Sequence, residues 1–243
     1  MIPRKVVLHR FTCFWAALYT WLNPIWRVTI HGREKIDPDR AVVMVANHLS
    51  FLDILVIFRL FTHFKWVSKA ENFRAPFIGW NMRLNGYIKV VRRQKKSVIR
   101  MMQECKDALS GGSSIMMFPE GTRSTTEEMG AFKPGAFQLA LDSGVPLQPL
   151  LIRGSANALP KRGFVLQGFH EISITVLDRI EPETFETTSA EELSTRVREI
   201  IFSEQHREDA HQIEALKMAR TRKAPVQSGQ PQRTEMVASP KLL

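Results

Sequence analysis

The sequence predicts an α/β fold: a single domain with a largely parallel or mixed central sheet that helices cover on both faces, preceded by an N-terminal helix. Two observations support this prediction. Short apolar runs typical of buried strands alternate with segments of helical periodicity over residues 26–188. In a sheet that is covered on both faces, each strand is a nearly continuous apolar run. The strand-like segments of this sequence are runs of that kind. The length of 243 residues suits one such domain with appended segments.

The N-terminal segment, residues 1–25, carries basic residues followed by an aromatic, apolar run over residues 11–22 that ends before Pro24. This run is shorter than the roughly 20 apolar residues that span a bilayer. No small-residue cleavage site follows it, so a signal peptide is rejected. Its aromatic residues and basic flank favour a helix lying in the membrane interface, and the alternative is a helix packed on the core.

The strands and helices of the domain follow in order. Strands are predicted at 26–31 (an edge strand), 41–46 (a central strand), 65–68, 87–91, 114–118, 147–153 and 171–177 (an outer strand). Helices are predicted at 53–61, in a short piece after Pro76 within the irregular segment 69–86, at 97–110, and at 135–143 before Gly144.

The C-terminal part divides into two segments. Residues 189–222 predict a charged helix that begins at Ser189, with Glu192 completing a capping box and an apolar face available for docking. Residues 223–243 are rich in Pro, Gln, Ser and Gly, which predicts a disordered tail.

The formal charge of +10 indicates an acidic partner: an anionic membrane surface, a phosphorylated substrate or a nucleic acid. Nucleic acid is disfavoured because the aromatic residues cluster in apolar runs and do not alternate with the basic ones. The two cysteines, Cys13 and Cys105, are not in CxxC spacing, so neither a disulfide framework nor a metal site is predicted, and no cofactor is expected.

A first chemical motif, Asn47-His48-Leu49-Ser50-Phe51-Leu52-Asp53, lies where the central strand should end and a helix begin. Strand ends are where α/β proteins place their sites. His48 can act as a general base near neutral pH, and Asp53 can hold its other ring nitrogen. The alternative is that Ser50 and Asp53 start a helix and His48 is a loop residue.

A second motif, Phe-Pro-Glu-Gly-Thr-Arg-Ser at residues 118–124, follows the strand at 114–118. It supplies flexible backbone, two hydroxyls and a guanidinium, all suited to phosphate oxygens. Arg123 is the first choice for a phosphate ligand, because its planar fork matches that geometry. The alternative is a turn with a surface ion pair.

These motifs resemble those of the glycerolipid acyltransferase family. Its N-H-x-x-x-x-D motif matches Asn47, His48 and Asp53, and its F-P-E-G-T-R-S motif matches at all seven positions. Two further blocks match in the family's order, P-F-x-G-W at 76–80 and V-P-(apolar)-x-P at 145–149, and a third, G-x-x-(aromatic or aliphatic)-x-x-R, is matched loosely by Gly86 and Arg92. The resemblance covers roughly residues 26 to 180.

The resemblance implies direct acyl transfer from a thioester, with His48 as general base and Asp53 orienting it. Glu120, Gly121, Thr122 and Arg123 would form the acceptor site. The further candidates for substrate binding are Arg92, Lys69 and Lys133. Lys89 occupies a position that is commonly apolar in the family, which leaves the choice between Arg92 and Arg93 open.

The oxyanion donors are not identified by the sequence. Asn47, through its side chain or the backbone N–H groups of residues 47–49, is the nearest candidate. The apolar residues Phe73, Phe77, Ile78, Trp80 and Met82 could line a groove for the acyl chain or belong to the core.

The expected function is therefore an O-acyltransferase that moves an acyl group from acyl-CoA or acyl carrier protein to the sn-2 hydroxyl of 1-acyl-sn-glycerol-3-phosphate. The product would be phosphatidic acid. The expected location is the cytoplasmic face of the inner membrane, peripheral or monotopic. The alternatives are another acceptor, such as a lyso-ornithine lipid or a lysophospholipid, and a non-catalytic protein that binds anionic lipids.

Overall fold

The structure is a computed structural model and describes residues 4–123, 128–158 and 168–223. Within these residues one seven-stranded sheet runs in the order β1-β7-β6-β2-β5-β3-β4. Its strands are β1 (Trp26–His31), β2 (Val43–Ala46), β3 (Phe64–Lys69), β4 (Ile88–Val90), β5 (Ser114–Met117), β6 (Leu147–Arg153) and β7 (His170–Val176). The five strands from β6 to β4 are parallel, β7 is antiparallel to β6, and β1 is parallel to β7. The mixed sheet is confirmed, with β1 at an edge and β2 in the centre.

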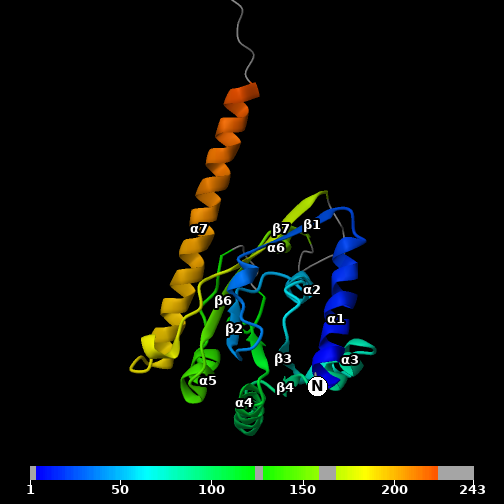
Figure 1. The fold of residues 1–243 in the computed structure, drawn as a ribbon, viewed down its shortest axis with the longest axis vertical. Coiled ribbons are helices and arrows are strands. Elements are labelled where there is room, and N and C mark those ends of the chain that lie inside the picture. The colour runs from blue at the N-terminus through cyan, green and yellow to red at the C-terminus, as the bar shows by residue number, and fades with distance from the viewer. Residues whose placement is uncertain (1–3, 124–127, 159–167, 224–243) are drawn as a thin grey trace, which may run out of the picture. The chain divides into compact units, whose positions relative to one another are not determined.

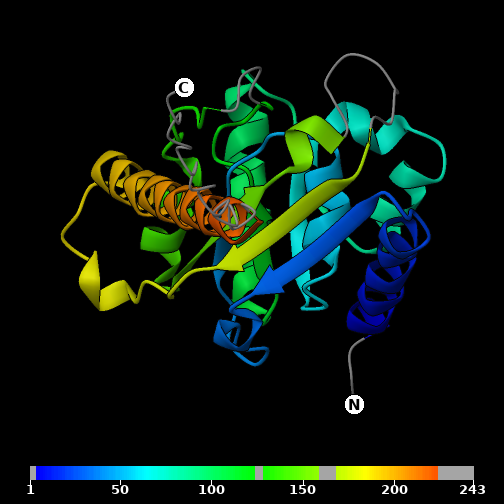
Figure 2. The ribbon, with the colours of Figure 1, turned by 90° about the horizontal axis from the view of Figure 1, so that it is seen from above.

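Helices lie on both faces of this sheet (Figures 1 and 2). They are α1 (Arg4–Trp21), α2 (Leu52–Phe58), α3 (Ile78–Leu84), α4 (Lys95–Ser110), α5 (Gly135–Ser143), α6 (Ser155–Ala158) and α7 (Ala190–Lys223). Short 3-10 turns occupy Arg33–Lys35, Ala70–Arg74 and Pro182–Thr184. Helix α6 and these turns were not predicted from the sequence, because they are too short to produce a periodic pattern.

The alternation of side chains along β2 explains why both faces are covered. Val43 and Val45 pack in one apolar cluster with α4, α5 and the start of α7. Met44 and Ala46 pack in a second cluster with α1 and α2 on the opposite face. All four side chains are fully buried, so the strand reads as a continuous apolar run in the sequence.

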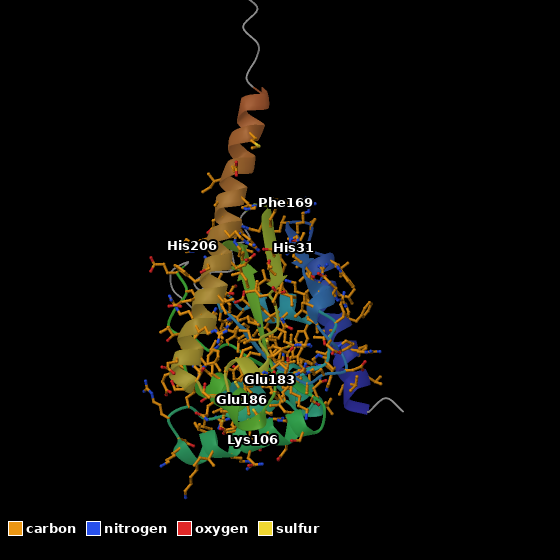
Figure 3. The ribbon with its side chains drawn as sticks, turned by 60° about the vertical axis from the view of Figure 1, so that its left-hand side comes forward. His31, Lys106, Phe169, Glu183, Glu186 and His206 are labelled. Atoms are coloured by element: carbon orange, nitrogen blue, oxygen red, sulfur yellow. The ribbon has the colours of Figure 1, made fainter. Side chains whose placement is uncertain are left out.

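Helices α4 and α5 lie side by side, and a salt bridge joins them. Lys106 Nζ, whose residue is labelled in Figure 3, lies 2.8 Å from Asp142 Oδ2. The predicted end of α5 is confirmed: Gly144 adopts a left-handed conformation with φ 59°.

The contacts divide the chain into two units, Met1–Gln205 and His206–Leu243. The start of α7 belongs to the first unit and has the predicted capping box, in which Ser189 and Glu192 exchange side-chain and backbone hydrogen bonds. Its predicted docking face is buried through Leu193, Val197 and Ile201. The second unit contains the continuation of α7 to Lys223, and residues 224–243 of the predicted tail lie outside the described residues.

The predicted N-terminal helix is confirmed as α1, which packs against α2. In the part of the chain that the structure describes, none of the helices has both the length and the apolar character needed to cross a bilayer.

Candidate active site

His48 and Asp53 meet at the carboxyl end of β2, where the chain turns into α2. His48 Nδ1 lies 2.8 Å from Asp53 Oδ2. The same oxygen accepts hydrogen bonds from the backbone N–H groups of Leu49 (2.7 Å) and Ser50 (2.8 Å). Because this oxygen serves as an acceptor throughout, Nδ1 is the ring nitrogen that carries the hydrogen. The Nε2 lone pair is then the one that can accept a proton.

The Asp53 carboxylate fits both interpretations of this motif, the helix start and the orientation of His48. Asp53 is fully buried and reaches back to the N–H groups that precede α2, as a helix-start residue does. It also orients the His48 ring, which keeps 13% of its side-chain surface exposed. Ser50 is buried and its Oγ accepts the N–H of Leu52, which agrees with a role in starting the helix. The helix start therefore positions the ring.

Asn47 holds the loop that follows β2 to the neighbouring strand β6 through hydrogen bonds. Its Nδ2 donates to the Ile152 carbonyl and its Oδ1 accepts the Ile152 N–H, both at 2.8 Å. The side chain is 2% exposed. The nearby N–H groups of His48 and Leu49 also donate to carboxylates, those of Glu120 and Asp53. These bonds do not support the predicted oxyanion role of Asn47, because the amide and its neighbours donate within the protein.

Glu120 connects the two motifs. Its Oε1 accepts the backbone N–H of His48 at 2.7 Å, and its Oε2 accepts the N–H of Gly130 at 3.2 Å. Burial raises the pKa of this carboxyl above its ordinary value, while the two N–H bonds act in the opposite direction. Both oxygens therefore have backbone partners, and the carboxylate holds the His48 loop against the 118–123 loop.

Phe118 forms one wall of the site, a role that the sequence did not reveal. Its ring stacks on the His48 ring, with centroids 3.9 Å apart and planes 9° apart. On its other side, Trp66 of β3 lies 5.4 Å away, centroid to centroid. Phe118, which follows β5, and Trp66 within the neighbouring β3 thus form an aromatic stack beside the imidazole.

A pocket of about 410 Å³ opens beside Phe118, where β4 and β5 end and α4 and α5 begin. Three of its residues are cationic, namely Arg92, Arg93 and Lys133, and Gly121 and Thr122 also border it. The rest of the wall is largely apolar, formed by Val90, Val98, Met101, Met117, Phe118, Pro119, Gly135 and Ala136. A cationic pocket with an apolar wall suits a molecule with one anionic group and one hydrocarbon part.

Gly121 allows the loop to curve around Lys133. Its φ is +75°, and an added Cβ would lie 2.8 Å from Lys133 Nζ. Arg93 also has a positive φ of 64°, which is uncommon for a residue other than glycine. Both residues whose roles the sequence left open, Arg92 and Arg93, therefore border the same pocket.

Arg123 and Lys69 are placed elsewhere. The Arg123 guanidinium lies over the ring of Phe51, 3.8 Å from its centroid, next to the His48 loop. Lys69 is exposed at the end of β3. Neither is among the residues that border the pocket, whereas Arg92, Lys133, Gly121 and Thr122 all border it.

Two supporting residues were missed by the sequence analysis. Gly130 donates its N–H to Glu120, and a Cβ there would lie 2.9 Å from Oε2 of that carboxylate. Arg198 of α7 donates to the carbonyls of Met129 (2.8 Å) and Gly130 (2.9 Å). Their signals are a lone glycine and one arginine of a charged helix, which are too common to be diagnostic.

Comparison with known proteins identifies the family of the chain. The acyltransferase family model matches residues 27–153. A 1-acyl-sn-glycerol-3-phosphate acyltransferase of Chlamydomonas reinhardtii is 42% identical over 158 residues, 65% of this chain and 47% of that protein. The chloroplastic enzyme LPAT1 of Arabidopsis thaliana, of the same name, is 35% identical over 160 residues, 65% of this chain and 44% of that protein. The chain thus spans less than half the length of these two relatives.

A solved structure shares the fold over most of both chains. The crystal structure of the 1-acyl-sn-glycerophosphate acyltransferase PlsC from Thermotoga maritima superposes with a TM-score of 0.71 at 25% identity. The likeness covers 86% of this chain and 84% of that chain. With the family model matching more than half of its residues, this chain belongs to the acyltransferase family.

Proposed function

We propose that the protein is an O-acyltransferase that acylates the sn-2 hydroxyl of 1-acyl-sn-glycerol-3-phosphate and forms phosphatidic acid. The observation that carries this proposal is the His48–Asp53 pair beside a cationic pocket. The names of the relatives in algae, plants and bacteria support the choice of acceptor.

The reaction needs one base at His48 Nε2. The acceptor hydroxyl attacks the thioester carbonyl, and Nε2 takes the hydroxyl proton as the new C–O bond forms. The C–S bond then breaks, and the imidazolium returns the proton to the departing thiolate. Asp53 stabilises the charged ring through Nδ1–H during this exchange. Ser50 is buried at the start of α2, so a direct transfer fits the site better than an acyl-serine intermediate.

The pocket supplies the ligands for the acceptor's phosphate. Arg92 and Lys133 offer positive charge, and Thr122 offers a hydroxyl. The beginning of α5 adds backbone N–H groups from Gly135 and Ala136, which border the same space. Arg123 does not bind the phosphate in this arrangement. Its guanidinium is stacked on Phe51 and can contact the substrate from the side of the His48 loop. The donor remains either acyl-CoA or acyl carrier protein.

The location proposed for the protein is the cytoplasmic face of the inner membrane, as a peripheral or monotopic protein. Support comes from the formal charge of +10 and from the exposed aromatic residues of α1, including Phe11, Phe14 and Trp15.

An assay of the purified protein with a panel of lyso-lipids and both donors tests the proposal. Lysophosphatidate is expected to be acylated fastest, with lysophospholipids and lyso-ornithine lipid slower. Preference for an acceptor without a terminal phosphate would reject the assigned acceptor. Vesicle binding without turnover on any acceptor would favour the non-catalytic alternative.

A further inference from the structure

Helix α1 has its polar and apolar faces reversed relative to a helix of a water-soluble protein. The face toward α2 and the core carries small or polar residues, namely His9, Thr12, Cys13, Ala16, Ala17 and Thr20, all buried. The face toward the surroundings carries large apolar residues at helical spacing, namely Val7, Phe11, Phe14, Trp15 and Tyr19, between 49% and 60% exposed. Helices in water do the opposite, so this face is built for an apolar partner.

A second exposed apolar group lies on α3, which packs beside α1 (Figure 1). Phe77 is 75%, Ile78 64%, Trp80 56% and Leu84 66% exposed. Within the segment predicted to line a groove or to belong to the core, Phe73 and Met82 are buried as core residues. The other three, Phe77, Ile78 and Trp80, are exposed, so they are not core residues.

The P-F-x-G-W block is shaped to hold these side chains outward. Phe77 has φ 60° and ψ −58°, and the N–H of Ile78 bonds the Pro76 carbonyl at 2.6 Å. This is the strained γ-turn, which is rare in proteins. Gly79 then lies so close to the Phe73 carbonyl that no Cβ would fit. Strain at an exposed aromatic residue indicates a functional surface.

Hydrogen bonds between polar side chains hold α3 against α1. Thr12 Oγ1 accepts hydrogen bonds from Asn81 Nδ2 (2.9 Å) and Asn85 Nδ2 (3.1 Å), and donates to the Leu8 carbonyl. Asn85 is 1% exposed. Polar atoms thus meet between the two helices while the apolar side chains lie outside, which is how helices pack in lipid.

We propose that α1 and α3 form one membrane-contacting surface, in which Phe77, Ile78, Trp80 and Leu84 enter the lipid interface together with the exposed stripe of α1. The occupant is a bilayer with anionic headgroups. Tryptophan and tyrosine favour the lipid interface, and Trp15, Tyr19 and Trp80 are all exposed here. Arg10 and Arg74, also exposed, lie on or next to these helices and match anionic headgroups. This inference rests on the proposed use of a lipid acceptor, which must be reached at the membrane.

The test compares the double variant Trp80→Ser/Leu84→Ser with Ile99→Ser, a matched control on α4 whose side chain is 60% exposed. Co-sedimentation with vesicles of phosphatidylcholine and phosphatidylglycerol should weaken at least about tenfold in the double variant, because two large side chains no longer leave water. The control should bind as the parent protein does. Equal binding of all three proteins would overturn the inference.

Two further measurements separate the possible outcomes. Turnover of lysophosphatidate presented in vesicles should fall in the double variant, while turnover of a short-chain, monomeric lysophosphatidate should be unchanged. If the parent protein acylates neither form, the proposed function fails, and the vesicle binding still decides the inference. Concentration-dependent dimers of the parent protein that the double variant abolishes would instead assign the surface to a second copy and overturn the lipid assignment.

Discussion

At the scale of single residues, one oxygen of Asp53 determines how the His48 ring is used. It accepts three hydrogen bonds, from the ring Nδ1–H and from two backbone N–H groups, so the carboxylate that orients the ring is itself held by the start of α2. The stacked Phe118 ring fixes its plane. A base whose position is set by a helix start and a strand end is preorganised before the substrate arrives.

Replacing His48 by alanine should therefore remove the base and leave the surface intact. We expect His48→Ala to lower kcat by ~100-fold or more, the usual contribution of a positioned general base. The variant should still co-sediment with anionic vesicles, because the ring is 13% exposed and lies off the helices that carry the apolar surface. Steady-state kinetics with lysophosphatidate provide the measurement. Unchanged turnover would remove His48 from the mechanism.

A variant of Glu120 can distinguish two roles for this residue, binding the acceptor and positioning the His48 base. In Glu120→Gln one side-chain oxygen remains, and the new NH₂ group faces the N–H of His48 or of Gly130. Such a mismatch between buried donors costs about 1–3 kcal/mol and loosens the His48 loop. We expect kcat to fall about tenfold or more while both KM values change little.

The control for this variant is Glu104→Gln, which alters an exposed ion pair with Arg100 on α4. It should leave kcat unchanged. A rise in the acceptor's KM at constant kcat in Glu120→Gln would instead show that the carboxylate contacts the acceptor, as the family resemblance implied.

At the scale of elements, the pocket is assembled from the ends of β4 and β5 and the beginnings of α4 and α5. Parallel strands place such ends at one edge of the sheet, so residues more than forty positions apart in sequence, such as Arg92 and Lys133, share a pocket. Arg123 lies on the other side of its loop, over Phe51.

This arrangement predicts different kinetics for two arginine variants. Arg92→Ala should raise the KM of lysophosphatidate about tenfold or more, the cost of one charged hydrogen bond to phosphate, with a much smaller effect on the donor's KM. Arg123→Ala should also raise the acceptor's KM more than the donor's, but by less than Arg92→Ala does. Substrate-dependence curves for each substrate, at saturating levels of the other, check this ranking. A larger effect of Arg92→Ala on the donor would assign the pocket to the donor's phosphates.

The sequence predicted most elements because their patterns are local. The strand before His48, the capping box at Ser189 and the glycine that ends α5 each follow from a few adjacent residues. What the sequence did not predict depends on long-range contacts. The pairing of Asn47 with Ile152, the bonds of Glu120 to His48 and Gly130, and the outward turn of Phe77 all require knowledge of which segments become neighbours.

At the scale of the whole molecule, a buried histidine links the apolar surface to the core. His9 of α1 is 1% exposed, bonds the Tyr87 hydroxyl through Nδ1 at 2.9 Å and donates from Nε2 to the Thr62 carbonyl at 3.0 Å. The ring of His63 lies 5.2 Å away, centroid to centroid. Protonation of Nδ1 would place a charge in this apolar site and oppose the hydrogen bond from Tyr87. The docking of α1 therefore depends on a neutral imidazole.

The lowered pKa of His9 determines in which direction, and over which pH range, the folding stability changes. Burial, aided by the neighbouring His63, lowers the pKa to about 3 from an ordinary value of 6.5. Between those values the unfolded chain binds the proton and the folded chain does not, so stability is fully present above pH 6.5 and is lost as the pH falls toward 3. From pH 7 to pH 5.5 one such group removes about 1 kcal/mol of the free energy of unfolding.

Urea unfolding of the parent protein and of His9→Gln at both pH values measures this contribution. The substitution is expected to change stability at both pH values, so the difference between the two pH values is the relevant quantity. That difference should be smaller in the variant by about 1 kcal/mol. His63, whose pKa is also lowered by burial, acts in the same direction in both proteins, and Glu120, whose pKa is raised, acts oppositely. Both proteins retain these two groups, so an equal pH difference in the two proteins would show that α1 stays docked with His9 charged.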